Sequence, residues 1–297
     1  MAIAEKLEYL NGTKQAIKTA IQNRGVSVSD TDTFREYATK IGDIGETVDK
    51  TKFGANIDMW VGDVDANGVL QAPTWSGALN FSGVKRLADL ALVNAFSYRE
   101  NLTSVDLSSL QTVGKNSLSK AFYNCTNLTS VDLSSLQSVD YYSLANVCYG
   151  CAKLTSVNLS SLQTVGSNGF YSAFSNCYAL TSVDLSSLQS VDNNGLSGTF
   201  SSCNTLTSVD LSSLQSVGSS GLSNAFLGCT NLVTMSFPSL TGFGAAPFGS
   251  QTYSYSFRNC TALTEIHFRA DVQATIEAMT GYADKWGATN ATIYFDL

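Results

Sequence analysis

The sequence predicts a solenoid, in which short parallel strands stack at one strand per coil. The first observation is a phrase, Leu-Thr-Ser-Val-Asp-Leu-Ser-Ser-Leu-Gln, that recurs with few changes. The second is its constant step of 26 residues, seen in the opening leucine at Leu102, Leu128, Leu154, Leu180, Leu206 and Leu232. The third is that Phe122 and Cys125 return at the same step. Such repeats bury their apolar residues only against neighbouring copies, so function must come from the surface of the stack.

Apolar spacing inside one copy places the strand and the walls of each coil. Leu102, Val105 and Leu107 alternate with Ser104 and Asp106, which is typical of a strand of about five residues with one buried face. Further apolar positions are expected to line the rest of the coil, and the outer side is predicted to be loop or short helix. These positions are Leu110, Val113, Leu118, Phe122 and Cys125.

The same spacing fixes the limits of the repeat array. A degenerate copy precedes the regular ones, and a later copy carries a five-residue insertion around Gly249 to Tyr253, so we assign the array to residues 79–268. Residues 269–297 are predicted to form a C-terminal cap, with a short helix over Ala270 to Met279 and a strand over Thr292 to Leu297.

The later part of each copy resembles a known family. The pattern Val-Gly-x-x-x-Leu-x-x-Ala-Phe-x-x-Cys-x-x-Leu, present at Val113 to Leu128 and at Val217 to Leu232, resembles the BspA-like class of leucine-rich repeats. The resemblance covers about two thirds of the chain and implies a leucine-rich-repeat solenoid. It also implies a binding or adhesion surface, on cell exteriors and virions alike.

Residues 1–45 differ from the array and are predicted to form a small helical segment for attachment or oligomerisation. Ile3, Leu7, Leu10, Ile17 and Ile21 follow a helical spacing, and a second helix begins near Asp30 or Thr31. The stretch from Leu10 to Ile41 resembles the N-terminal segment of tailed-bacteriophage tail and tail-fibre proteins. That resemblance implies contacts with other tail proteins through these helices, and a homo-oligomer such as a trimer. Residues 46–78, with Trp60 and Trp75, are predicted to form a linker and an N-terminal cap.

Composition limits the classes of function. The net charge is −7 and only 14% of residues are charged, so there is no basic stripe for nucleic acid. No apolar stretch approaches the length of a membrane span. Met1 to Leu10 contains Glu5, Lys6 and Glu8, which argues against a signal peptide and favours a virion protein made in the host cytoplasm.

The chemistry-bearing residues favour structure over catalysis. Five periodic cysteines, Cys125, Cys151, Cys177, Cys203 and Cys229, are predicted to be reduced and buried one above another. Cys148 and Cys151 form a lone C-x-x-C with no second pair, so we predict no metal site and no cofactor. The single histidine, His267, should face solvent on its strand, and no unique nucleophile accompanies it. We therefore predict that the chain is not an enzyme and has no catalytic residues.

A column of outward acidic residues leaves two interpretations open. The residues are Asp106, Asp132, Asp184 and Asp210, with Asn158 in the middle of the series. Like charges at strand spacing repel, so something must offset them. Solvation with hydrogen bonds to neighbouring Ser and Thr is one explanation, and a ladder of bridging cations is the other.

The segment after Val113 changes most between copies, and it carries the candidate ligand-binding residues. These are Tyr123, Tyr141, Tyr142, Tyr149, Tyr171 and Tyr178, which stand among Ser, Asn and Gly. A mixture of Tyr, Ser, Asn and Gly is typical of paratopes, so we predict a recognition surface on this side. Relaxed constraint on exposed loops would explain the variation equally well.

Together these observations favour a non-enzymatic binding protein of a phage tail or tail fibre, which contacts a bacterial surface glycan or protein. A structural or decorative virion protein without a ligand is the competing interpretation. A bacterial surface adhesin is a third, disfavoured by the absence of an export signal.

Overall fold

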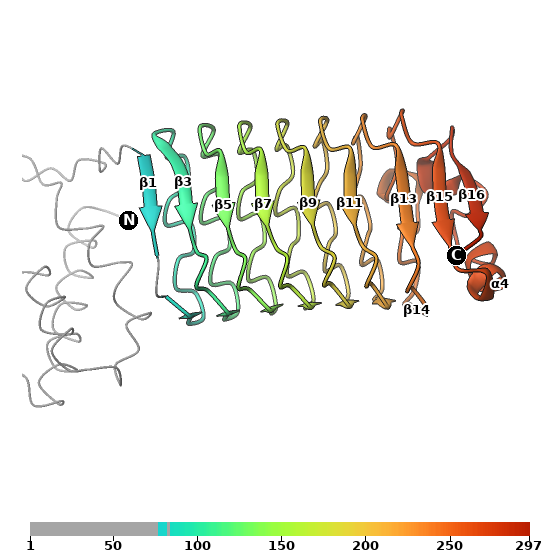
Figure 1. The fold of residues 1–297 in the computed structure, drawn as a ribbon, viewed down its shortest axis with the longest axis horizontal. Coiled ribbons are helices and arrows are strands. Elements are labelled where there is room, and N and C mark those ends of the chain that lie inside the picture. Colours follow the sequence, from blue (N-terminus) through green and yellow to red (C-terminus); the bar gives the residue numbers. More distant parts are fainter. Residues whose placement is uncertain (1–76, 82–83) are drawn as a thin grey trace, which may run out of the picture. The chain divides into compact units, whose positions relative to one another are not determined.

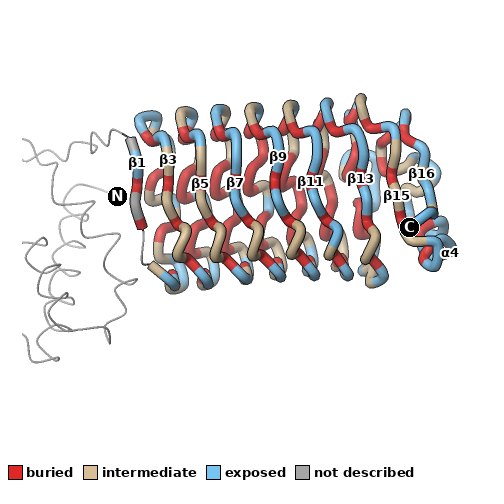
Figure 2. The backbone as a smooth tube through the Cα atoms, in the orientation of Figure 1, coloured by how far each residue is buried: buried red, intermediate tan, exposed pale blue. Residues whose placement is uncertain are grey.

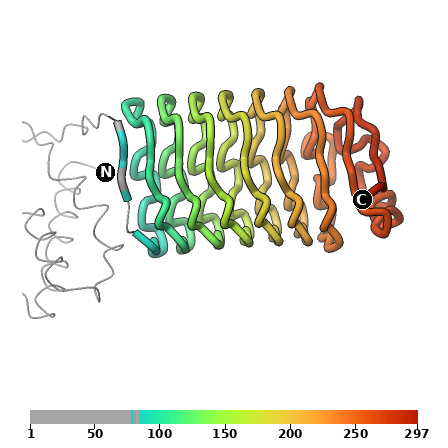
Figure 3. The backbone as a smooth tube through the Cα atoms, viewed as in Figure 1, coloured from blue at the N-terminus to red at the C-terminus, as the bar shows by residue number. Residues whose placement is uncertain are grey.

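A computed structural model describes residues 77–81 and 84–297, which belong to a compact unit spanning residues 75–297. These residues wind into a stack of coils, each stepping along the stack by one strand (Figures 1 and 3). The predicted solenoid is confirmed. The predictions for residues 1–45 and for nearly all of residues 46–78 lie outside the described residues.

The recurring phrase forms the first sheet, which has six parallel strands in the order β1-β3-β5-β7-β9-β11. From β3 on, each strand residue pairs with the residue one period later in the next strand, as Val105 does with Val131. Only β3 reaches the expected five residues, and the later strands have three. The bounds are β1 (Gly77–Asn80), β3 (Leu102–Asp106), β5 (Ser130–Asp132), β7 (Ser156–Asn158), β9 (Ser182–Asp184) and β11 (Ser208–Asp210).

A second parallel sheet of seven strands, one more strand per coil than the sequence predicts, runs through the column of Val113. Its strands have two residues each, too short for any alternating pattern to appear in the sequence. Thr112 pairs with Ser138, and Val113 with Val139. The bounds are β2 (Arg86–Leu87), β4 (Thr112–Val113), β6 (Ser138–Val139), β8 (Thr164–Val165), β10 (Ser190–Val191), β12 (Ser216–Val217) and β14 (Gly242–Phe243).

The C-terminal end closes with a third parallel sheet, β13 (Thr234–Phe237), β15 (Glu265–Phe268) and β16 (Thr292–Phe295). Phe237 pairs with Phe268, so the inserted residues before β15 are accommodated without disturbing the register. The insertion contains the 3-10 helix η2 (Thr252–Ser254). The expected cap helix is shorter and divided, as η3 (Ala270–Val272) and α4 (Gln273–Glu277), and η4 (Lys285–Gly287) follows it.

The core is a set of columns that run along the inside of the stack (Figure 2). Rings from successive coils stack on each other, as Phe174 does on Phe200 at 6.0 Å and Phe200 on Phe226 at 5.8 Å between ring centroids. Burying one such side chain contributes about 1.5–3 kcal/mol. Because every coil presents the same apolar columns to its neighbours, the surface is the only part of the array free to differ.

Candidate binding surface

The outer side of each coil, which we call the turn side, is a series of consecutive turns with no helix between residues 114 and 229. Alternate amides close turns within the coil, such as Ala121 N–H to the carbonyl of Leu118 at 3.0 Å. The remaining amides donate to the next coil, such as Leu118 N–H to the carbonyl of Ser143 at 2.8 Å. The outer side, predicted to be loop or short helix, therefore consists of turns. Their backbone N–H and C=O groups are paired within the coil and between coils, as they would be in a sheet.

Three residues per coil on the turn side have positive φ angles, four residues apart. The five coils between residues 116 and 228 contain fifteen such positions. Ten of them are Asn or Gly, the residues that adopt left-handed backbone at least cost. The positions are Asn116, Lys120, Asn124, Tyr142, Asn146, Gly150, Asn168, Ser172, Asn176, Asn194, Gly198, Ser202, Ser220, Asn224 and Gly228. Backbone geometry thus explains much of the Asn and Gly content that resembled a paratope, and leaves the tyrosines to be explained.

Two of the predicted tyrosines form a ladder across neighbouring coils. The rings of Tyr123 and Tyr149 are parallel within 4° and 4.9 Å apart. Tyr98, which the sequence reasoning missed, extends the ladder with its ring 5.5 Å from that of Tyr123. It lies one position away from the repeat register, in the atypical opening coil beside Arg99, so periodicity alone would not reveal it. Partial burial, with Tyr149 and Tyr98 nearby, raises the pKa of Tyr123.

The other four tyrosines occupy different parts of the turn side. Tyr141 and Tyr142 pack edge to face at 4.6 Å, and Tyr141 is 47% exposed. Tyr171 and Tyr178 are also exposed, and the Tyr178 hydroxyl donates to Asn176 Oδ1 at 3.3 Å. The structure therefore brings the candidates together as one ladder and one pair, rather than as one continuous patch.

A groove of about 320 Å³ lies where the second sheet meets the turn side, and its lining includes Asp140, the residue before Tyr141 in the sequence. Asp140 and Asp192, two coils apart, lie on either side of Gly166 in its lining. A Cβ at Gly166 would lie 3.0 Å from the carbonyl oxygen of Val139, a tight contact that glycine avoids. The hydroxyl residues Ser138, Thr164 and Ser190 complete a polar lining. The sequence reasoning did not identify this groove.

The acidic column has a local role in the backbone. Oδ1 of Asp106, Asp132 and Asp210 each accepts the N–H of the serine two residues later at 2.9 Å, and Asp184 does so at 3.0 Å. Hydrogen bonds from the Ser186 side chain and then its N–H hold the pKa of Asp184 below its usual value. These bonds give each of the four carboxylates a partner within its own coil. Within residues 77–81 and 84–297, no group of three His, Cys, Asp or Glu is arranged to hold a metal ion.

The periodic thiols are buried and unpaired, as expected. Each also has a partner that the sequence did not predict, because its S–H donates to a backbone carbonyl of the preceding coil. The distance is 3.2 Å from Cys203 to Phe174 and 3.1 Å from Cys229 to Phe200. Burial raises the pKa of Cys203 to about 12, so this thiol stays protonated and unreactive near neutral pH.

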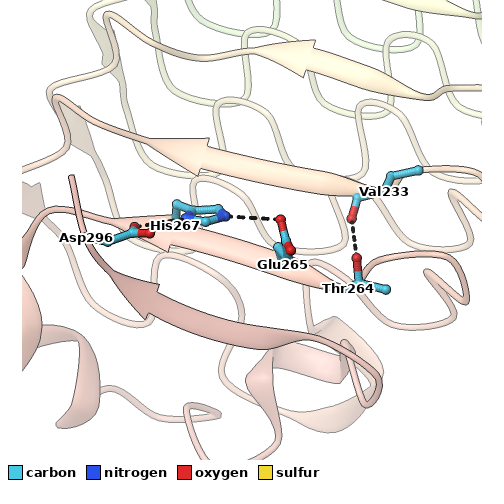
Figure 4. A network of polar contacts seen from close by, with 5 residues as sticks. All are labelled: Val233, Thr264, Glu265, His267 and Asp296. Carbon is cyan, nitrogen blue, oxygen red and sulfur yellow. Dashed lines mark hydrogen bonds and ion pairs between the residues drawn. The ribbon is translucent and has the colours of Figure 1, made fainter.

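His267 on β15 is more enclosed than expected, with 22% of its side chain exposed. Nδ1 lies 2.9 Å from Asp296 and Nε2 lies 3.4 Å from Glu265 (Figure 4). The ring also stacks on Tyr294. Burial alone lowers the pKa of His267, but the hydrogen bonds and charges of Asp296 and Glu265 outweigh burial and raise it. This cluster fastens β16 to β15 at the end of the stack.

The comparisons with known proteins agree with this geometry. Parallel coils that repeat every 26 residues match the leucine-rich-repeat class of solenoid. The profile of the BspA type leucine rich repeat region matches residues 92–195 and 119–253, which together are more than half of the chain. The chain therefore belongs to the BspA-type leucine-rich-repeat family.

Three bacterial proteins are among the solved structures to which the chain is similar. A leucine rich cell surface protein of Faecalibacterium prausnitzii is 24% identical over 64% of this chain and 46% of that one, with a TM-score of 0.44. A leucine-rich repeat protein of Bacteroides ovatus is 17% identical over 74% and 70%, with a TM-score of 0.30. An internalin of Listeria monocytogenes is 15% identical over 74% and 61%, with a TM-score of 0.29.

The chain spans less than half of the Faecalibacterium protein. No curated protein sequence is significantly similar to the chain. In the part of the chain that the structure describes, no helix has the length and apolar character needed to cross a membrane.

Proposed function

We propose that this chain is a non-enzymatic binding protein that recognises a bacterial surface through its turn side, as a component of a phage tail or tail fibre. The observation that carries the proposal is the ladder of Tyr98, Tyr123 and Tyr149. Tyr98 is 66% exposed, although an aromatic ring is favoured in the core of a coil. Exposed tyrosines give a rigid, amphipathic contact area at low cost in conformational entropy.

A saccharide is the ligand that this surface suits best. Sugar rings have apolar faces that can lie on aromatic rings and hydroxyl edges that need hydrogen-bond partners. The groove lined by Asp140 and Asp192 supplies such partners, because these carboxylates accept hydrogen bonds and Ser138 and Thr164 both donate and accept. The net charge of −7 favours a neutral or weakly charged ligand over a strongly anionic one.

The assignment to a virion is supported by the resemblance of Leu10 to Ile41 to tail and tail-fibre proteins. In this proposal, residues 1–45 attach the chain to other tail proteins and bring the copies into a symmetric oligomer such as a trimer. Measuring the mass in solution with and without residues 1–45 tests the oligomer. A monomeric full chain would remove the oligomerisation role from this segment.

A structural role without a ligand is the second candidate, and one observation favours it. The rings of Tyr123 and Tyr149 cover each other, so their packing could serve the stability of neighbouring coils alone. If so, replacing the rings should lower stability and leave adsorption to bacteria unchanged.

The experiment compares binding of labelled full chain to intact bacterial cells and to an array of purified bacterial surface glycans. Tyr98→Ser/Tyr123→Ser/Tyr149→Ser tests the ladder, and Tyr141→Ser/Tyr142→Ser/Tyr171→Ser tests the rest of the turn side. We expect the first variant to lose binding by about tenfold or more, since one desolvated aromatic contact contributes 1–2 kcal/mol or more. Tyr253→Ser is the matched control, because Tyr253 is exposed in the insertion before β15. Unchanged binding by both variants would remove the recognition surface.

A further inference from the structure

A second pocket, separate from the tyrosine ladder and the groove, lies where the last full coil meets the C-terminal cap. Its volume is about 360 Å³, within the usual range of about 300–1,000 Å³ for small-ligand sites. The coil contributes Arg258 and Asn259, the insertion contributes Thr252, and the cap contributes Asp284, Thr289 and Asn290. The pocket therefore exists only because the regular repeat ends here.

The wall formed by the cap is held firmly in place. Lys285, Trp286 and Gly287 have φ angles of 48°, 46° and 88°, a left-handed run that is unfavourable for the two residues that carry a Cβ. Burial compensates for this strain, because the Trp286 ring is fully buried 4.6 Å from Phe248 and its Nε1 donates to the Thr280 carbonyl at 2.9 Å. Strained backbone persists where the surrounding structure fixes it, often at binding sites.

Glycine at position 287 brings this wall directly against Arg258. A Cβ there would lie 2.7 Å from the Arg258 Cα, a distance that real Cβ atoms essentially never show. Asn290, also in the cap, ties this wall to the coil because its Nδ2 donates to the carbonyl of Thr261 at 3.1 Å. The pocket is thus preformed, and a ligand would not have to order it.

Arg258 is the unusual residue in this pocket. No Lys or Arg stands between Lys153 and Arg258 in the sequence, and the equivalent positions in earlier coils are Tyr123, Tyr149 and other uncharged residues. Its Nε is buried without a hydrogen-bond partner. Across residues 77–81 and 84–297, no ion pair or hydrogen bond of its guanidinium is found, whereas Arg269 forms two bonds to Asp271 at 2.7 and 2.8 Å.

An unpartnered buried donor on a charged group costs free energy that a bound acceptor would recover. A guanidinium offers a planar fork of donors that matches a carboxylate. The neutral side chains around it, Thr252, Asn259, Thr289 and Asn290, suit hydroxyl groups. We propose that this pocket binds the carboxylate of a small hydroxylated acid, such as a uronic acid unit of a bacterial polysaccharide, through Arg258.

Asp284 narrows the choice of anion. It lies on the exposed rim, so its charge opposes a second negative charge on the ligand. A single carboxylate is therefore favoured over phosphate, which carries more charge at neutral pH. Asp284 also supplies an acceptor for a sugar hydroxyl, which a purely basic pocket would lack.

The test titrates the full chain with glucuronic acid, and separately with glucose, acetate and inorganic phosphate, by calorimetry or NMR shift mapping. We expect saturable binding of glucuronic acid in the millimolar range, tighter than for any of the other three by tenfold or more. Arg258→Gln should weaken it by about ten- to a hundredfold, which is the effect of losing charge-assisted hydrogen bonds. Arg258→Lys should be intermediate, and Asp284→Asn should bind more tightly.

Arg269→Gln is the matched control, since it removes an arginine that is already paired to Asp271, and it should bind as the unchanged chain does. Far-UV circular dichroism and the melting temperature establish that each variant is folded. Equal binding by the Arg258→Gln, Arg258→Lys and unchanged chains overturns the proposal, and so does the absence of saturable binding of glucuronic acid up to about 50 mM. Equal affinity for phosphate or for acetate overturns the ligand class. Because the tyrosine variants leave this pocket intact, failure here and failure of the turn-side proposal are distinguishable.

Discussion

The side of each coil that carries the first sheet, which we call the strand side, and the turn side differ in how their surface residues are constrained. Along the first sheet, Asp106, Asp132, Asp184 and Asp210 repeat the same residue, and each accepts the same backbone N–H. On the turn side the residues change from coil to coil, but the positions of positive φ do not. Repetition on the strand side therefore reflects the backbone N–H that each carboxylate accepts. Variation on the turn side is limited by the backbone too, because the left-handed positions favour Asn and Gly.

The comparison shows where a recognition residue can be sought in a repeat of this kind. Asn and Gly at the left-handed positions are explained by conformation, and the carboxylates of the strand side by hydrogen bonding. Residues that neither explanation covers are Tyr98, Tyr123, Tyr149 and Arg258. Tyr98 is exposed, Tyr123 and Tyr149 are half-buried and stack on each other, and Arg258 Nε lacks a partner, which is why the two proposals rest on them.

The largest effect should come from the core that both sides share. Phe200→Ala removes a fully buried ring that stacks on Phe174 and Phe226, and we expect a loss of about 3–5 kcal/mol in the free energy of unfolding. Phe243→Ala is the matched control, because Phe243 is only half-buried on β14. Urea unfolding monitored by circular dichroism measures both, and equal losses would contradict the assignment of Phe200 to the core column.

The next largest loss of stability should come from a left-handed position on the turn side, where it shows whether backbone conformation governs the choice of residue. Asn168 has a φ of 56°, so Asn168→Val should cost about 1–2 kcal/mol or more, whereas Asn168→Gly should be close to neutral. Ser167→Val, at the adjacent position outside the left-handed series, should have little effect. If valine is tolerated equally at both positions, the left-handed series does not govern the choice of residue.

A smaller effect is expected on the strand side. Asp184→Ala removes the acceptor of the Ser186 N–H and should cost about 0.5–1.5 kcal/mol, while Asp184→Asn should keep most of that stability, as Asn158 does naturally. The pKa of Asp184 is lowered in the folded state. Its contribution is therefore present above the unfolded pKa near 3.9 and is lost as the pH falls through the folded pKa. Thermal melts between pH 2 and 6 measure the loss. An Asn variant as unstable as the Ala variant would instead indicate a role for the charge.

Adding calcium to the same melts tests the cation ladder. With the carboxylates already bonded to backbone amides, millimolar calcium should leave the melting temperature unchanged. A clear rise that Asp184→Asn and Asp210→Asn abolish would restore the bridging interpretation.

The sequence could predict the features that depend on period and polarity, which include the array, the inward columns, the buried thiols and the enlarged loop before β15. It could not predict the second sheet, because two-residue strands such as Thr112–Val113 carry no pattern of their own. Nor could it predict that Tyr98 joins the tyrosine ladder, or that a groove lies at Gly166 and a pocket at Arg258. These depend on which residues of different coils, or of coil and cap, come together in space.

The smallest effect concerns the single histidine, which fastens the last strand through Asp296 and Glu265. Because the pKa of His267 is raised on folding, its contribution is fully present below the unfolded pKa near 6.5 and is lost as the pH rises through the folded pKa. The chain has no other histidine. Stability should therefore decline from pH 6 to pH 8 by a fraction of a kcal/mol, in keeping with an ion pair near the surface. His267→Gln should abolish the decline while the strand-side acids keep their own dependence at low pH. Hydrogen exchange at the amides of β16 gives the local readout, and pH-independent protection there in the unchanged chain would contradict the fastening role.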